Sequence, residues 1–211
     1  MLPLIEKPLR AYARRGFFSS WSLFILSLPR LRLMLSSLFL SKRRFPPGRL
    51  APTAKPCVTW DEVKTVDTRE LFARLIRCEA GGEGLDGMRA VATVVMNRAR
   101  VPHGEYFRIC QGDVRRVITQ ACQFSCHKST IGGVQNNQNV WVLTPEDIHY
   151  QVADWAMNGG IFTGVGSNVL WFMNPFSPDC PNFFPYNKTG YWFTRVNQHC
   201  FFNPTEAYAQ T

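Results

Sequence analysis

The chain has 211 residues, 45% of them hydrophobic, which is enough to bury one core and leave an appendage. Its net charge is +9, but residues 1–50 hold ten of the 24 Lys and Arg residues and one of the 15 acidic residues, so residues 51–211 are formally neutral. A neutral body offers no general electrostatic surface for a polyanion, and this excludes nucleic acid as an expected partner.

Residues 1–56 are expected to form a basic, hydrophobic arm that ends in a Pro-rich linker. The apolar run FFSSWSLFILSL (17–28) follows Arg10, Arg14 and Arg15, as the hydrophobic region of an export signal does. It is too short to span a bilayer alone. Three interpretations stay open: a segment that contacts or anchors to a membrane, an uncleaved export signal, and an unstructured or misassigned start.

Residues 57–211 are expected to form a single domain whose first helix lies within VDTRELFARLIRCEA (66–80). Asp67 is the predicted N-cap, and Glu70 stands three positions later in a capping-box arrangement. Spacings of three, four and seven residues place one carboxylate on the same face as three apolar side chains, namely Phe72, Leu75, Ile76 and Glu79.

Two further helices are predicted. MRAVATVVM (88–96) is apolar almost all round, which is typical of a helix inside the core, with Asp86 as a candidate cap. In LTPEDIHYQVADWAMNGG (143–160), Thr144 is the predicted N-cap, Pro145 the first helical residue, and a Gly pair follows the end.

The last third of the chain changes character. NVLWFMNP (168–175) and YWFTRVNQHCFF (191–202) are short and aromatic, and the segment 176–190 between them is rich in Pro, Asn and Gly. These segments predict strands around a long irregular loop. Helices first and strands later indicate an α+β domain.

Glu79 is a candidate general acid. Its expected position on an apolar face, in the last turn of a helix, favours the uncharged carboxylic acid because burial and the helix dipole both raise the pKa. Such an acid can protonate a glycosidic oxygen. The glycines at positions 81, 82 and 84 would let a bulky polymer approach. The alternative is a structural ion pair of Glu79 with Arg77 or Arg98.

The segment RLIRCEAGGEGLDGMRAVATVVMNRAR (74–100) resembles the opening of the SleB/CwlJ family of bacterial cell-wall hydrolases, which includes spore cortex-lytic enzymes. The positions of this pattern are filled by Glu79, Ala80, Gly82, Glu83, Gly87, Asn97 and Arg98. Further similarities lie in QFSC (123–126) and LWFMNP (170–175), and the segments DCP (179–181) and HCFFNPT (199–205) resemble the CwlJ branch.

The resemblance implies a fold like those of lysozyme and lytic transglycosylases, and cleavage of the bond between N-acetylmuramic acid (MurNAc) and N-acetylglucosamine (GlcNAc) in spore germination. Glu79 would donate a proton and then accept one from the muramoyl 6-hydroxyl, giving an anhydro product. Glu83 is the candidate for a second catalytic carboxylate. Hydrolysis and transglycosylation stay open, and no cofactor or metal is expected.

The same motifs supply candidate substrate-binding residues, for which structural roles are the alternative: Asn97, Arg98, Gln123, Ser125, Trp171, Asn174 and His199. The aromatic residues Tyr191 and Trp192 are expected in the core more than in a sugar site. Cys180 and Cys200 are candidates for a disulfide between the long loop and the last strand. The expected partners are peptidoglycan glycan strands, with a spore-coat protein as a further candidate, and the expected location is outside the cytoplasmic membrane.

Two other functions fit the sequence less well. A peptidase or amidase could use Cys200 or a Cys/His metal cluster, but the adjacent His199 and Cys200 would face opposite sides of a strand. A wall- or coat-binding protein without activity is the second alternative. The intact set of Glu79, Ala80, Gly82 and Glu83 disfavours it.

Overall fold

The computed structural model describes residues 63–185 and 187–211. The predictions for the arm at 1–56 lie outside these residues. The helices come first and are α2 (Thr68–Ala80), α3 (Gly84–Arg100), α4 (Gly104–Cys110), α5 (Val114–Thr119) and α6 (Asp147–Met157). Within the described part of the chain, none is both long and apolar enough to cross a membrane.

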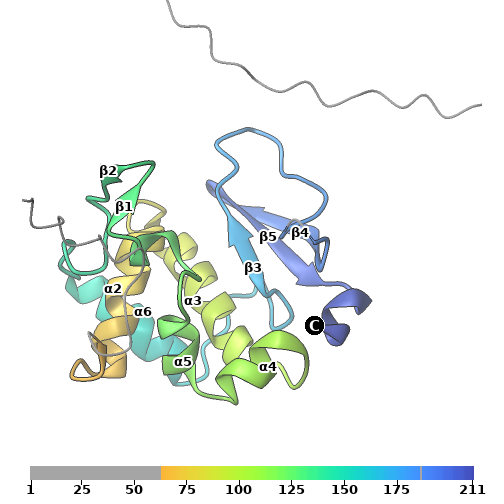
Figure 1. Cartoon of the computed structure of the whole chain (residues 1–211), viewed down its shortest axis with the longest axis horizontal. Helices are drawn as coiled ribbons and strands as arrows, with labels where there is room; N and C mark the ends of the chain where they lie inside the picture. Colours follow the sequence, from red (N-terminus) through yellow and green to blue (C-terminus); the bar gives the residue numbers. More distant parts are fainter. Residues whose placement is uncertain (1–62, 186) are drawn as a thin grey trace, which may run out of the picture. The chain divides into compact units, whose positions relative to one another are not determined.

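A small antiparallel sheet follows the helices, as predicted for an α+β domain, with strand order β3-β5-β4. Its strands are β3 (Trp171–Met173), β4 (Gly190–Val196) and β5 (His199–Pro204). Figure 1 shows this sheet beside the group of α2, α3 and α6. Minor elements are the hairpin of β1 (Thr130–Ile131) and β2 (Val134–Gln135) and the 3-10 helices η1 (Ser125–His127) and η2 (Glu206–Gln210).

The start of α2 partly follows the prediction. The Asp67 side chain accepts a hydrogen bond from the Glu70 backbone N–H at 3.0 Å, so the predicted cap is confirmed. The Glu70 carboxylate does not complete a capping box. It accepts hydrogen bonds from Arg74 Nε at 2.6 Å and from the Tyr150 hydroxyl at 2.5 Å, because these partners offer stronger contacts.

Two predicted helix starts are wrong by two or three residues. The second helix begins at Gly84, and Asp86 lies in its first turn instead of capping it. The last long helix is capped by Glu146 and not by Thr144. The reason is a reciprocal pairing with His149, whose ring Nδ1 accepts the Glu146 backbone N–H at 2.9 Å.

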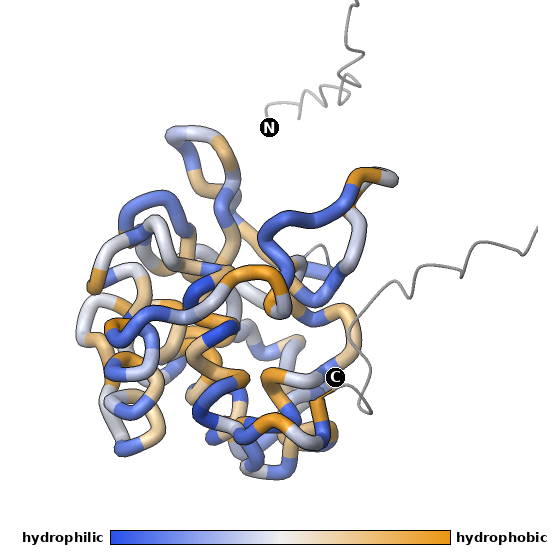
Figure 2. The backbone as a smooth tube through the Cα atoms, turned by 90° about the vertical axis from the view of Figure 1, so that its left-hand side faces the viewer, coloured by the Kyte–Doolittle hydropathy of each residue, from blue (hydrophilic) through white to orange (hydrophobic). Residues whose placement is uncertain are grey.

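The core lies between the helices and the inner strand of the sheet. Phe72, Leu75 and Ile76 of α2 are fully buried, which confirms the predicted apolar face. They pack in the same cluster as α3, α6 and Phe202 of β5. In Figure 2 the hydrophobic stretches of the backbone lie toward the middle of the body, while several outer loops are hydrophilic.

The carboxyl-terminal end of α3 is bound to the segment that enters β3. Asn97 Nδ2 donates to the backbone carbonyls of Gly166 at 2.9 Å and Val169 at 3.0 Å. Arg98 Nε donates to the Leu170 carbonyl at 2.6 Å. Asn97 is only 3% exposed, so its amide replaces water as the partner of buried carbonyls.

The loop between β3 and β4 is cross-linked to the sheet. A disulfide joins Cys180 to Cys200 of β5, with 5.8 Å between their Cα atoms, as the candidate pairing predicted. The segment 191–202, expected as a strand, is a hairpin of β4 and β5. It turns at Asn197, whose φ of 50° is one that Asn tolerates better than most residues.

Replacing Asn97 with Ala should test its structural role. The variant leaves two carbonyls without a partner, so we expect the free energy of unfolding to fall by about 2–4 kcal/mol in urea titrations. The exposed Asn137→Ala is the matched control and should change it by less than about 0.5 kcal/mol. Unchanged stability of Asn97→Ala would contradict the structural role.

Candidate active site

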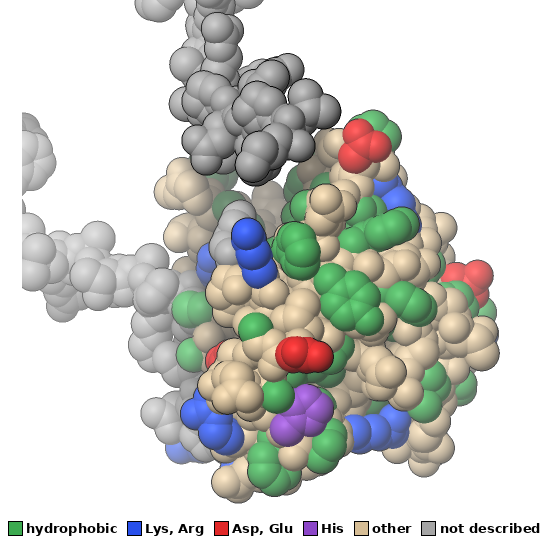
Figure 3. Space-filling model, turned by 90° about the vertical axis from the view of Figure 1, so that its right-hand side faces the viewer, with side chains coloured by type: hydrophobic (Ala, Val, Ile, Leu, Met, Phe, Trp, Pro, Cys, Tyr) green, Lys and Arg blue, Asp and Glu red, His purple; other side chains and the backbone are tan. Residues whose placement is uncertain are grey.

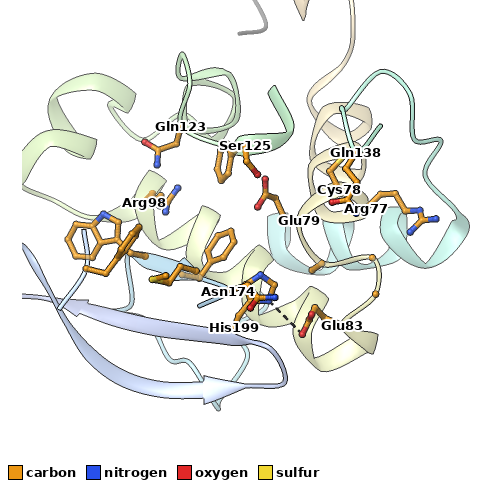
Figure 4. Close-up of a pocket in the computed structure, with 18 of the residues that line it drawn as sticks. Arg77, Cys78, Glu79, Glu83, Arg98, Gln123, Ser125, Gln138, Asn174 and His199 are labelled. Carbon is orange, nitrogen blue, oxygen red and sulfur yellow. Dashed lines mark ion pairs between the residues drawn. The ribbon is translucent and has the colours of Figure 1, made fainter. Parts of the chain in front are cut away.

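A cleft of about 730 Å³ lies where the end of α2 meets the sheet. Its walls come from the end of α2 and the turn into α3, from the segment that precedes η1, and from β3 with the loop that follows it. Figure 4 shows Glu79 near the middle of this cleft, with Ser125 facing its carboxyl group. Sequence segments 40 to 120 residues apart therefore form one site.

Glu79 sits in the last turn of α2 as an acid without an ion-pair partner among the described residues. Its Oε1 atom is inaccessible to water and finds no hydrogen-bond partner in the described structure. The basic residues considered as partners are engaged elsewhere. Arg77 Nη2 lies 3.6 Å from Glu146 Oε1, and Arg98 Nε donates a hydrogen bond to the Leu170 carbonyl. Neither Arg77 nor Arg98 forms the ion pair with Glu79 that was the predicted alternative.

Burial raises the pKa of Glu79 above its usual value of 4.5, because the charged form loses water. The thiol and backbone of Cys126, the positive charge of Arg98 and the hydroxyl of Ser125 act in the opposite direction and lower the pKa. Desolvation is the largest of these effects, so the pKa stays raised. The site therefore favours a protonated carboxylic acid that has polar groups beside it.

Glu83 lines the same cleft but is bound to the β4–β5 hairpin. Its Oε2 atom accepts the backbone N–H of Gln198 at 2.9 Å, and its backbone carbonyl accepts Asn197 Nδ2 at 2.6 Å. Gly87 makes room for this conformation, since a Cβ there would lie 2.3 Å from Glu83 Cβ. The contacts join the start of α3 to the sheet.

His199 completes this junction. Its Nδ1 atom lies 3.6 Å from Glu83 Oε2, and both side chains are about nine-tenths buried. Burial lowers the pKa of His199, while the Glu83 carboxylate acts to raise it. The net direction is down, so the imidazole is mainly neutral near pH 7 and the pair is chiefly a polar contact.

Arg98 is a buried cation enclosed by aromatic rings. Its guanidinium carbon lies 5.0 Å from the ring centre of Tyr106, 5.4 Å from that of Phe124 and 5.9 Å from that of Phe172. Its Nη1 atom is buried without a hydrogen-bond partner in the described structure. The rings stabilise the charge without neutralising it. Arg98 thus brings positive charge to the cleft wall.

Eight of the nine site residues predicted from the motifs line the cleft: Glu79, Glu83, Arg98, Gln123, Ser125, Trp171, Asn174 and His199. Asn97 does not, because its amide is turned to backbone carbonyls. Trp171 is only 5% exposed and packs against Tyr208, so most of its ring serves the core. Asn174 Oδ1 accepts the Phe176 backbone N–H at 2.8 Å and shapes the loop.

Sequence reasoning missed several residues of the cleft. Glu105 of α4, Gln138 and Phe176 line it, and none belongs to a recognised motif. Only their tertiary position reveals them, because their neighbours in the sequence carry no catalytic pattern. Cys78 also lines the cleft and is a free thiol.

The described residues do not support a peptidase or amidase that uses Cys200 or a cluster of metal ligands. Cys200 is held in the disulfide with Cys180, so it has no free thiolate to act as a nucleophile. Across residues 63–185 and 187–211, no three His, Cys, Asp or Glu side chains form a group that could hold a metal ion.

Comparisons with known proteins agree on one family. The Cell Wall Hydrolase family model matches residues 82–202, a range that includes Glu83 and begins three residues after Glu79. Cell wall hydrolase CwlJ of Halalkalibacterium halodurans is 33% identical over 140 residues, which cover 65% of this chain and 86% of the relative. CwlJ of Bacillus subtilis is 29% identical over 136 residues, covering 64% and 84%.

Among solved structures, the catalytic domain of the germination-specific lytic transglycosylase SleB from Bacillus anthracis aligns with a TM-score of 0.45 and 21% identity. The alignment covers 64% of this chain and 93% of that domain.

The raised pKa of Glu79 should appear in the pH dependence of stability. The folded state holds this proton more tightly than the unfolded chain, so the free energy of unfolding falls as pH rises from 4.5 through the folded pKa. The Glu79→Gln variant has no titrating carboxyl group at this position, so its free energy of unfolding does not fall for this reason. We expect it to gain stability relative to the wild type between pH 4 and pH 7 in urea titrations. Parallel pH profiles would contradict the raised pKa, and Glu206→Gln, an exposed acid, is the control.

Proposed function

The chain belongs to the Cell Wall Hydrolase family, as its motifs predicted, and we propose that it cleaves the glycosidic bond between MurNAc and GlcNAc in peptidoglycan with Glu79 as the general acid. The observation that carries this proposal is the Glu79 carboxyl group in the middle of the cleft, which has no ion pair among the described residues, a buried Oε1 atom without a hydrogen-bond partner, and a raised pKa. Such an acid is still protonated at pH values where exposed carboxylates are charged.

In the first step Glu79 donates its proton to the bridging oxygen of the glycosidic bond. The bond between this oxygen and the anomeric carbon of MurNAc breaks, and the GlcNAc side leaves as an alcohol. Positive charge develops on the sugar ring while Glu79 becomes a carboxylate. The Ser125 hydroxyl and the Arg98 charge both favour this charged form.

In the second step the Glu79 carboxylate takes the proton of the muramoyl 6-hydroxyl, whose oxygen bonds to the anomeric carbon and gives a 1,6-anhydro end. Water in place of this hydroxyl would give a reducing end. We favour the anhydro product because Glu83, the nearest second carboxylate in sequence, is about nine-tenths buried and accepts the Gln198 backbone N–H. An ordinary glycosidase needs a second free carboxylate beside the bond.

Further proposals concern the substrate and its surroundings. We infer that Gln123, Ser125 and Asn174 contact the sugars, because their polar side chains line the cleft around Glu79. Spore-cortex peptidoglycan in germination is the proposed substrate, on the basis of the CwlJ-like segments and the CwlJ relatives. Activity would then lie outside the cytoplasmic membrane. The arm at 1–56 as a signal or anchor, and a spore-coat partner, stay predictions.

Mass spectrometry of the products tests the proposal. Glu79→Gln keeps the shape of the side chain but cannot supply the proton, so digestion of purified peptidoglycan should slow by about 10²–10⁴-fold. The wild type should release fragments with anhydro ends. Freed peptides would indicate a peptidase, and reducing ends would indicate hydrolysis. Full activity of Glu79→Gln would overturn the mechanism.

The Glu83→Gln variant tests whether Glu83 joins α3 to the β4–β5 hairpin or acts as a second catalytic carboxylate. The amide oxygen can still accept the Gln198 N–H, so we expect kcat to fall by less than about tenfold, with a lower midpoint in urea. A loss as large as that of Glu79→Gln in a folded protein would instead assign Glu83 to the chemistry.

A further inference from the structure

Four aromatic side chains are exposed at the edge of the sheet, and we call them the aromatic patch. They are exposed by nearly half: Phe183 49%, Tyr191 44%, Trp192 47% and Phe193 46%. Figure 3, which faces the side where the sheet lies, shows hydrophobic side chains gathered on this surface. The sequence placed Tyr191 and Trp192 in the core more than in a sugar site, and the structure places them outside it.

The backbone of β4 explains why consecutive aromatic residues are exposed. β4 is an edge strand, with only β5 beside it for most of its length. Side chains of a regular strand alternate between two faces, but the register shifts between Trp192 and Thr194 and leaves Phe193 as an extra residue. The bulge therefore accounts for the exposure of Phe193, whereas Tyr191 and Trp192 pair regularly with Asn203 and Phe202 and project to opposite sides of this edge strand.

The patch continues the wall of the cleft. Phe184 and Pro185 line the cleft, and Phe183 directly precedes them in the chain. This segment pairs with the start of β4: the Phe184 backbone N–H donates to the Gly190 carbonyl at 3.0 Å, and Phe183 forms a bridge with Tyr191.

Gly190 is required for this close pairing. A Cβ at that position would lie 2.0 Å from the Phe184 carbonyl oxygen, which no side chain permits. The segment of the cleft wall at Phe184 is thus paired closely with the start of β4.

Large exposed aromatic side chains that gather at one edge of a sheet often mark an interaction site. The cleft has the volume of a site for a ligand of a few rings, whereas a glycan strand is a polymer that must leave it at both ends. A strand leaving along the Phe184 wall meets the patch. Aromatic rings there can pack against the apolar C–H faces of sugar rings.

We propose that the aromatic patch is a second subsite for the glycan strand, which binds sugars beyond those held in the cleft. This rests on the proposed function in one respect, that a glycan strand occupies the cleft. Lys188 adds a cation beside the patch, with its Nζ atom 5.9 Å from the ring centre of Phe183. That charge suits the carboxylates of the peptide stems.

Binding measurements on the full chain carrying Glu79→Gln test this subsite without cleavage. The probes are a peptidoglycan tetrasaccharide and long glycan strands stripped of peptide. Adding Trp192→Leu should weaken binding of the long strands about tenfold, or roughly 1.4 kcal/mol, and leave the tetrasaccharide affinity unchanged. Trp192→Phe, which keeps an aromatic face, should stay within about threefold. Phe107→Leu on α4 is the matched control at 48% exposure.

Each other outcome overturns the proposal. Unchanged binding of long strands by Trp192→Leu, or an equal loss for the tetrasaccharide, would remove the second subsite. Loss of binding to free peptide stems or to a coat protein, with glycan binding intact, would make the patch a protein-docking surface. Thermal unfolding checks the fold, and Tyr191→Leu and Phe193→Leu replace any unfolded variant.

The two proposals fail separately. If the wild type releases peptides and makes no glycan ends, the glycosidase function falls, while the strand-length dependence of glycan binding still decides the role of the patch. If the patch variants bind long strands as the wild type does, the patch proposal falls, and cleavage by the intact Glu79 is untouched.

Discussion

The attachment of α3 to the sheet at both of its ends is the constraint on which the site depends. At the amino-terminal end, Glu83 binds the backbone N–H of Gln198 in the β4–β5 turn. At the other end, Asn97 and Arg98 bind carbonyls of the segment that enters β3. A helix of 17 residues spans about 25 Å, so these contacts fix its direction as well as its distance. Glu79, one turn before α3, is thereby held opposite β3 without an ion pair of its own.

The break between α2 and α3 gives two glutamates of one motif different surroundings. In a continuous helix, Glu79 and Glu83 would lie on the same face one turn apart, and their charges would repel. The chain instead leaves α2 at Gly81 and begins α3 at Gly84. Both residues line the cleft, but only the Glu83 carboxylate is bound to the β4–β5 hairpin. Proximity in sequence is a poor guide to a shared role here.

The sequence predicts the features that depend on near neighbours. The Asp67 cap and the position of Glu79 on an apolar face follow from spacing alone, and both are found. The N-cap of α6 was predicted at Thr144 but lies at Glu146. The position of this cap depends on a contact with His149 that composition does not reveal. The short helices α4 and α5 went unpredicted, since six or seven residues carry too little periodicity. Glu105 lines the cleft only because of its tertiary position. Trp192 is exposed because β4 is an edge strand.

The surroundings of Glu79 suit a residue that has to act in both charge states. Desolvation alone would keep the acid protonated but would make its carboxylate too costly to form after proton donation. Arg98 and Ser125 reduce that cost, because a nearby cation and a hydroxyl both stabilise the carboxylate. An ion pair with Arg98 would keep Glu79 charged before the reaction, so Glu79 would have no proton to donate. The aromatic rings around Arg98 and its bond to the Leu170 carbonyl hold the cation back from such a pair. A single carboxyl group can then donate a proton and take one back, as the proposed mechanism requires.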